Sequence, residues 1–247
     1  MSRPPGALVT RPREDAKAIS GALERRGFAV RIEPLLTIVT KAGSIPAIDG
    51  VQGILATSAN GVRAFAAQSA ERDLPLWAVG DATARCAGEF GFHRVASAGG
   101  DVESLAALVA SRAEPNAGAL LHVAGTAVAG DLAGRLQRHG FDVRRAVLYE
   151  AQPATALSAA LCAALDGDEL DIALFFSPRT AETFATLTET AGRTESCRKI
   201  VACALSPAVA GRLSRLPWQS VIVAARPDQD ALLAGIDNEI AARGGTP

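Results

Sequence analysis

The sequence predicts an α/β protein with two similar lobes, each a parallel sheet flanked by helices. Three observations lead to this fold class. Short apolar strands alternate with Ala- and Leu-rich helical stretches, a pattern typical of parallel sheets covered on both faces. The chain has 247 residues, 49% of them hydrophobic, which is enough for two domains of ordinary size. Several segments of the first half also recur, in the same order, in the second half.

The first predicted strand covers residues 7–10 and is followed by a helix over 12–26. Apolar residues recur there at helical spacing, and Gly27 ends the helix. Further strands are predicted at 29–32, 53–57, 76–79, 94–96, 119–123 and 142–149. A helix over 154–165 then precedes strands at 172–176, 199–204 and 220–225, and the last helix begins near Asp228.

Three of the predicted strands are followed directly by capping residues. These are Thr-Ser-Ala-Asn at 57–60, Ser-Pro-Arg-Thr at 177–180 and Ser-Pro-Ala at 206–208. A serine N-cap, with proline at the first helical position in two cases, is a strong signal for a helix start. Such starts lie at the carboxyl ends of strands, and ligands bind at this edge in open parallel sheets.

The two halves of the chain can be aligned on four ordered segments. Residues 26–30 match 139–143, Thr57, Ser58 and Phe65 match Phe176, Ser177 and Phe184, residues 80–84 match 206–210, and residues 101–105 match 228–232. The offset in residue number between matched positions grows slowly along the chain and never decreases, as small loop insertions would produce. We interpret this as a duplicated unit, although two α/β stretches can also look alike through composition alone.

Composition excludes several classes of protein. Lys+Arg total 25 and Asp+Glu 26, for a net charge of -1, so the basic excess of a general nucleic-acid binder is missing. We identify no signal peptide at the start of the chain and no apolar run long enough to cross a bilayer. These features predict a cytoplasmic protein that binds neither nucleic acid nor membrane.

The sequence also gives no sign of a metal, a disulfide or a cofactor. Its four cysteines stand far apart and form no CxxC motif, at Cys86, Cys162, Cys197 and Cys203. They are expected to be reduced thiols without a metal. Neither GxGxxG after a strand nor GxxxxGK[ST] occurs, so no cofactor is predicted.

Short motifs along nearly the whole chain resemble one known family. They are VTRP at 9–12, PLL at 34–36, TSANGVR at 57–63, WAVGDATA at 77–84, LYEA at 148–151, FSPRTA at 176–181 and SPAVA at 206–210. In this order and spacing they resemble the uroporphyrinogen-III synthases of tetrapyrrole biosynthesis. Each motif alone is weak, and the order and spacing together carry the resemblance.

The resemblance implies two HemD-like, flavodoxin-like α/β lobes joined by a two-stranded linker. A terminal lobe would comprise residues 1–34 with 153–247, and a central lobe residues 40–146. The linkers would be residues 33–39 and 145–153. Because the linkers fall inside the repeats, each lobe would combine a piece of one repeat with a piece of the other.

The resemblance also implies a reaction. The substrate and sole partner would be hydroxymethylbilane, a linear tetrapyrrole with eight carboxylates, and the protein would act as a monomer. Loss of water creates a cationic azafulvene, and the macrocycle closes through a spiro intermediate with ring D inverted. The free bilane can also close without inversion, so the enzyme would have to control conformation as well as rate.

A flexible polyanion calls for many donors, and helix N-termini supply free backbone amides and partial positive charge. The expected substrate-binding residues are Thr10, Arg11, Thr57, Ser58, Asn60, Arg63, Gly80, Ser177, Arg179 and Ser206. The alternative is that each serine is a plain helix cap and each arginine a solvated surface charge. A cap leaves other amides of its helix free, so capping and ligand binding are compatible.

Tyr149 is the single tyrosine of the chain and the predicted catalytic residue. The resemblance places a tyrosine beside the cleft between the lobes, where its phenol could help the substrate hydroxyl to leave. The alternative is a half-buried linker residue with a wet hydroxyl. Two other functions stay open: a non-catalytic two-lobed binding protein for an anionic small molecule, and an interaction or regulatory module that kept only the fold.

Overall fold

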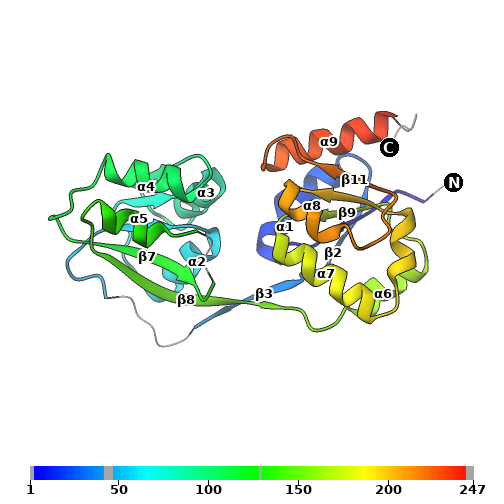
Figure 1. The fold of residues 1–247 in the computed structure, drawn as a ribbon, viewed down its shortest axis with the longest axis horizontal. Helices are drawn as coiled ribbons and strands as arrows, with labels where there is room; N and C mark the ends of the chain where they lie inside the picture. The colour runs from blue at the N-terminus through cyan, green and yellow to red at the C-terminus, as the bar shows by residue number, and fades with distance from the viewer. Residues whose placement is uncertain (1–2, 42–46, 128–129, 243–247) are drawn as a thin grey trace. The chain divides into compact units, whose positions relative to one another are not determined.

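The computed structural model describes residues 3–41, 47–127 and 130–242. The chain forms two compact units (Figure 1): a terminal unit, Met1–Thr37 with Gln152–Pro247, and a central unit, Ile38–Ala151. The predicted class, α/β with two similar lobes of mostly parallel strands, is confirmed. The predicted lobe boundaries include residues outside the described ranges and stay a prediction.

The terminal unit contains one sheet whose neighbouring strands are all parallel. Its order is β11-β10-β9-β1-β2, with bounds Ser220–Val223, Val201–Ala204, Ile172–Phe175, Gly6–Val9 and Ala29–Ile32. Its helices are α1 Arg13–Glu24, α6 Ala159–Asp166, α7 Pro178–Thr190, α8 Pro207–Leu213 and α9 Gln229–Ala242, with a 3₁₀ helix η1 at Thr194–Lys199.

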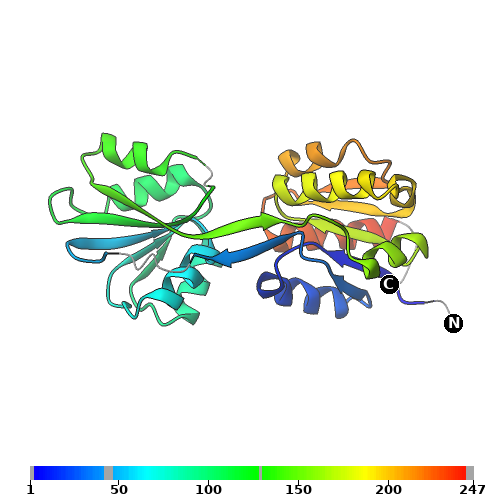
Figure 2. The ribbon, with the colours of Figure 1, turned by 90° about the horizontal axis from the view of Figure 1, so that it is seen from below.

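Helices cover both faces of this sheet, as Figure 2 shows. One face packs against α6, α7 and α8, where the Phe175, Phe184 and Trp218 rings have centroids 5.1 to 5.7 Å apart. The other face packs against α1 and α9 through side chains such as Ile19 and Leu232. Burial on both faces explains why the strands read as continuous apolar runs.

The central unit contains a sheet of order β3-β8-β7-β4-β5-β6. The bounds are Leu36–Thr40, Val143–Pro153, Ala119–Gly125, Val51–Ala56, Leu76–Ala78 and Val95–Ser97. Its helices are α2 Ala59–Gln68 and α3 Asp81–Glu89 on one face and α4 Val102–Ala110 and α5 Leu132–Arg138 on the other.

The chain passes between the units within β3 and within β8. The Lys41 amide donates to Leu148 O over 2.8 Å, and the Ala154 amide donates to Leu35 O over 2.9 Å. Along these two bonds the residue number rises in β3 while it falls in β8, so the two strands are antiparallel. The other described neighbours in this sheet are parallel.

The two units share a five-strand topology. Strands β1, β2, β9, β10 and β11 correspond in order to β7, β8, β4, β5 and β6. The matched segments at Gly27 and Gly140 end helices α1 and α5 in the same way. Both glycines have φ 83°, and the following Phe28 and Phe141 amides donate back to Leu23 and Leu136 carbonyls. This agreement supports the duplication read from the sequence.

Some elements differ from the sequence-based expectation. The helix expected over 154–165 begins at Ala159, because Ser158 is its N-cap and accepts from the Leu161 amide over 3.0 Å. The preceding residues extend β8 to Pro153, and η1 was not predicted. None of the helices in the described ranges is long and apolar enough to span a membrane.

Candidate functional site

The carboxyl edge of the central sheet carries the start of α2. Ser58 follows β4, has extended backbone, and its hydroxyl accepts from the Gly61 amide over 3.3 Å. A Cβ added to Gly61 would lie 2.4 Å from Val123 O, so only glycine lets the helix approach β7 this closely. The first turn of α2 is therefore held directly against the end of β7, with amide donors at its open end.

Tyr149 lies at this same edge, on β8 beside the end of β7. Its phenol oxygen is 2.8 Å from Ser58 Oγ. A Cβ on Gly125 would lie 2.8 Å from two of its ring carbons, so the ring rests on the bare backbone of β7. Its carbonyl accepts from the Thr126 amide over 3.0 Å. The half-buried Tyr149 is thus held at its ring, its hydroxyl and its backbone.

Thr57, one residue before the cap, makes a different contact. Its hydroxyl lies 3.1 Å from Nε2 of His122 on β7. His122 is 3% exposed. Burial, and secondarily the charge of Arg145, lower the pKa of His122 to about 4, so the imidazole is neutral near pH 7. The Arg145 guanidinium donates to Gly125 O and Thr126 O over 2.6 and 2.9 Å.

The other predicted residues of the central unit lie on neighbouring helix starts. Arg63 donates to the Asn60 side chain over 2.8 Å, one turn apart on α2. Gly80 is the N-cap of α3 and has no side chain to satisfy the first amides of that helix. Because β4 and β5 are adjacent, the α2 and α3 amide ends belong to one edge.

The terminal unit has a corresponding edge with a different chemistry. Ser177 and Ser206 cap α7 and α8, accepting from the Thr180 and Val209 amides over 3.1 and 3.4 Å. The Ser177 hydroxyl is also 2.8 Å from that of Thr180, within its own helix. Thr10 is fully buried and donates to Leu174 O over 2.7 Å, so its hydroxyl ties β1 to β9.

The two arginines predicted for this edge have different settings. Arg11 lies over the Phe176 ring, with its guanidinium carbon 3.8 Å from the ring centroid, and its Nη1 donates to Gln229 Oε1 over 3.5 Å. Burial lowers the pKa of Arg11, and Asp15 opposes this effect. Arg179 is exposed in the first turn of α7, with no side-chain hydrogen bond or ion pair to other described residues.

The structure therefore brings some of the predicted residues together within each unit, but not Thr10, whose hydroxyl is used inside the sheet, or Arg179, which contacts none of the others. Ser58 contacts Tyr149, Asn60 contacts Arg63, and Arg11, Ser177 and Ser206 lie at the ends of strands from one sheet. Sequence reasoning missed His122, Arg145, Gly125 and Phe176. The available signal for His122 was an ionisable residue inside the apolar stretch 119–124, which the repeat pattern alone does not mark.

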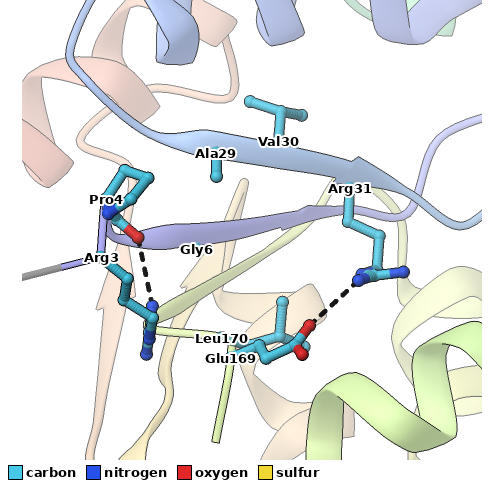
Figure 3. Close-up of a pocket in the computed structure, with 8 residues that line it drawn as sticks. All are labelled: Arg3, Pro4, Gly6, Ala29, Val30, Arg31, Glu169 and Leu170. Atoms are coloured by element: carbon cyan, nitrogen blue, oxygen red, sulfur yellow. Dashed lines mark hydrogen bonds and ion pairs between the residues drawn. The ribbon is translucent and has the colours of Figure 1, made fainter. Parts of the chain in front are cut away.

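A cavity of about 470 Å³ lies at the opposite, amino edge of the terminal sheet (Figure 3). Its arginines are paired with carboxylates: Arg31 contacts Glu169 at 3.1 Å and Arg3 contacts Asp171 at 2.8 Å. Such neutralised arginines offer little to an anion. In the described part of the chain, no group of three or more His, Cys, Asp or Glu side chains is placed to hold a metal ion.

Fold and edges together define a class of protein: a duplicated two-unit α/β protein that presents capped helix starts and polar side chains at the carboxyl edge of each sheet. Comparison with known proteins makes the assignment specific. The family model for uroporphyrinogen-III synthase HemD (HEM4) matches residues 17–234. No curated relative matches the sequence significantly.

Two solved structures share the fold. Uroporphyrinogen-III synthetase from Helicobacter pylori is 16% identical with a TM-score of 0.63, over 95% of this chain and 99% of that one. A mutant uroporphyrinogen III synthase from the extremely thermophilic bacterium Thermus thermophilus is 20% identical with a TM-score of 0.57, over 96% and 99%. At these identities the likeness shows the fold alone. The matched family model shows that the chain belongs to the uroporphyrinogen-III synthase HemD family, a family of tetrapyrrole biosynthesis.

Proposed function

We propose that this protein is a uroporphyrinogen-III synthase, a cyclising lyase that converts hydroxymethylbilane to uroporphyrinogen III with loss of water and inversion of ring D. The observation that carries the proposal is the half-buried Tyr149 phenol, fixed 2.8 Å from Ser58 at the start of α2. The family assignment supports the reaction class, and this geometry supports the choice of catalytic residue.

The hydrogen bonds around Ser58 suggest how the phenol would work. The Ser58 hydroxyl oxygen already accepts from the Gly61 amide, and in the proposed arrangement Ser58 donates its own proton to the Tyr149 oxygen. The phenol proton is then available to the substrate hydroxyl. Transfer of that proton as the C–O bond breaks would release water and leave a phenolate, which the Ser58 hydroxyl and the α2 amide end would stabilise.

Substrate binding would use the donors at each carboxyl edge. The carboxylates of the bilane would meet the amide ends of α2, α3 and α7 together with Arg63, Arg11 and Arg179. Arg11 is the best prepared of these side chains, because the Phe176 ring holds its guanidinium in place. A preorganised guanidinium loses less conformational entropy when it binds a carboxylate. Monomeric state and cytoplasmic location stay predictions.

The decisive experiment mixes the protein with hydroxymethylbilane and measures which isomer forms. Isomer III above the uncatalysed background is the expected result. Binding of the bilane without isomer III would instead support a non-catalytic binding protein.

Single-turnover rates at saturating bilane then test Tyr149→Phe, which removes one oxygen and keeps the ring on Gly125. General-acid help reaches roughly 10²–10⁴-fold where fully used, and we expect a loss at or below about 10²-fold, since water can substitute. Substrate affinity should change little. Equal rates for the variant and the wild type would make Tyr149 a structural residue and leave a site built mainly from backbone amides.

A further inference from the structure

His122 is a buried histidine on an interior strand of the central sheet. Among the buried polar side chains of the described residues, the others are hydroxyls, and His122 is the one ionisable group. It lies on β7 between β4 and β8, paired in register with Leu55 and Arg145. Burying an imidazole in such a place costs free energy unless the group gains a hydrogen bond there.

The terminal unit shows that the fold does not need this imidazole. Val9 pairs with Leu174 in β1 and β9 as His122 pairs with Leu55 in β7 and β4, and both leucines stand two residues before the matched pair Phe176 and Thr57. Val9 is fully buried. A valine therefore fills the equivalent position, and packing alone does not account for the histidine.

Thr57, the hydrogen-bond partner of the imidazole, also differs from its counterpart in the terminal unit. His122 Nε2 meets the Thr57 hydroxyl at 3.1 Å, whereas the terminal unit has Phe176 at the place of Thr57. The histidine and the threonine thus occur as a pair in one unit and are both missing from the other. Ser58, the next residue, is the one that holds the Tyr149 phenol.

We propose that His122 is a positioning residue for the Tyr149 phenol, acting through the junction of Thr57 and Ser58. The imidazole fixes the Thr57 side chain at the end of β4. This limits the movement of Ser58, whose hydroxyl must reach both the Gly61 amide and the phenol. The inference deepens the proposed function, on which the catalytic meaning of the phenol rests, but the contact itself can be measured without turnover.

The chain makes this measurement simple because it contains a single tyrosine. Labelling with ¹³Cζ-tyrosine gives one resonance, whose chemical shift reports the hydrogen bond to the phenol oxygen. Ser58→Ala removes the direct partner and sets the direction of the expected shift. His122→Val, copied from the terminal unit, and Thr57→Val should each move the resonance the same way by a smaller amount.

Three further variants separate positioning from general loosening of the fold. Thr57→Ser keeps the hydroxyl and should restore the wild-type resonance. The double variant Thr57→Val with His122→Val should shift the resonance no further than either single change, since both remove one bond. His93→Val, at an exposed histidine beyond α3, is the matched control and should leave the resonance in place.

An unmoved tyrosine resonance in both His122→Val and Thr57→Val would overturn the proposal, even if these variants unfold more easily. Activity provides the second readout: both variants should lower kcat for isomer III more than they change KM. If the protein forms no isomer III at all, the proposed function fails while the resonance shifts still decide the positioning role.

Discussion

The two units have the same strand order but different chemistry at three matched positions of their carboxyl edges. Where the terminal unit has Val9, the central unit has His122. Phe176, which supports Arg11, corresponds to Thr57, which contacts His122. Ser177 and Ser58 are both N-caps, but Ser177 contacts Thr180 in its own helix and Ser58 contacts Tyr149 on another strand.

Under the proposed function, this difference would divide tasks between the duplicated units. The terminal edge places a cation at a helix start, which suits binding of a carboxylate. The central edge places a polar network around a phenol, which suits proton donation to a leaving hydroxyl. The shared caps and glycine turns maintain the fold in both units, and the divergent residues lie at or just below the carboxyl edge of each sheet.

Acid should affect the two units unequally, and this is the largest effect we expect. The folded-state pKa of His122 is about 4, against 6.5 for the ordinary side chain. Between these values the unfolded chain binds a proton that the folded central unit does not. The contribution of His122 to stability is therefore intact above about pH 6.5 and declines as the pH falls toward 4, by about 3 kcal/mol in total.

Each unit has one tryptophan, Trp77 in the central unit and Trp218 in the terminal unit. Denaturant unfolding can be followed at pH 7 and pH 4.5 through the two indole N–H resonances. Between these pH values, the free energy of unfolding reported by Trp77 should fall more than that reported by Trp218. In His122→Val the excess loss at Trp77 should vanish. An equal loss for both tryptophans in the wild type would show that His122 does not set the acid response.

The fold was largely predictable because its signals are local. Gly27 and the serine caps mark where helices end and begin, and apolar runs mark strands buried on both faces. Those signals also recur at matched positions, so the duplication could be read without coordinates. The start of α6 was misjudged, because the alanine-rich segment from Ala154 has helical composition. The extension of β8 to Pro153 depends on pairing with β3, and the local Ser158 cap then sets the start of the helix.

The site was only partly predictable because its contacts join residues far apart in the chain. The sequence marked Ser58 as a cap and Tyr149 as a single tyrosine, but their 2.8 Å contact depends on how β8 lies beside β7. Nothing in the sequence distinguishes Gly125 from other glycines, yet the Tyr149 ring rests on it. No pattern in one sequence could show that His122 faces Thr57, because the two residues meet only across the β4–β7 pair.

Removing the matched serine caps should separate their roles. An N-cap is worth about 1 kcal/mol, so Ser58→Ala and Ser177→Ala should lower the free energy of unfolding by similar amounts. Ser58→Ala should also lower kcat about fivefold, because a lost hydrogen bond of about 1 kcal/mol to the phenol weakens its action. Ser177→Ala should act mainly on KM, through the amide end of α7.

Ser158→Ala is the control for a serine cap outside the proposed site, since Ser158 caps α6 and its hydroxyl donates to Glu33 over 2.8 Å. It should lower stability by about 1 kcal/mol and leave both kinetic parameters as they are. Steady-state kinetics together with urea unfolding would test all three variants. A kcat loss in Ser177→Ala as large as that in Ser58→Ala would remove the distinction between the two edges.

The smallest expected effect concerns the thiols, which report how often each unit opens. Cys162 is partly exposed, whereas Cys86 in the central unit and Cys197 and Cys203 in the terminal unit are buried. Burial raises the pKa of Cys197 to about 12, so at pH 8 only about 10⁻⁴ of this thiol is the reactive thiolate in the folded state. Iodoacetamide at pH 8, followed by peptide mass spectrometry, should therefore label Cys162 first and the other three only through opening.

In His122→Val the labelling rate of Cys86 should change while that of Cys203 stays constant, because the substitution acts within the central unit. Equal changes at both thiols would mean that the two units open together, and that the contrast between them is confined to their carboxyl edges.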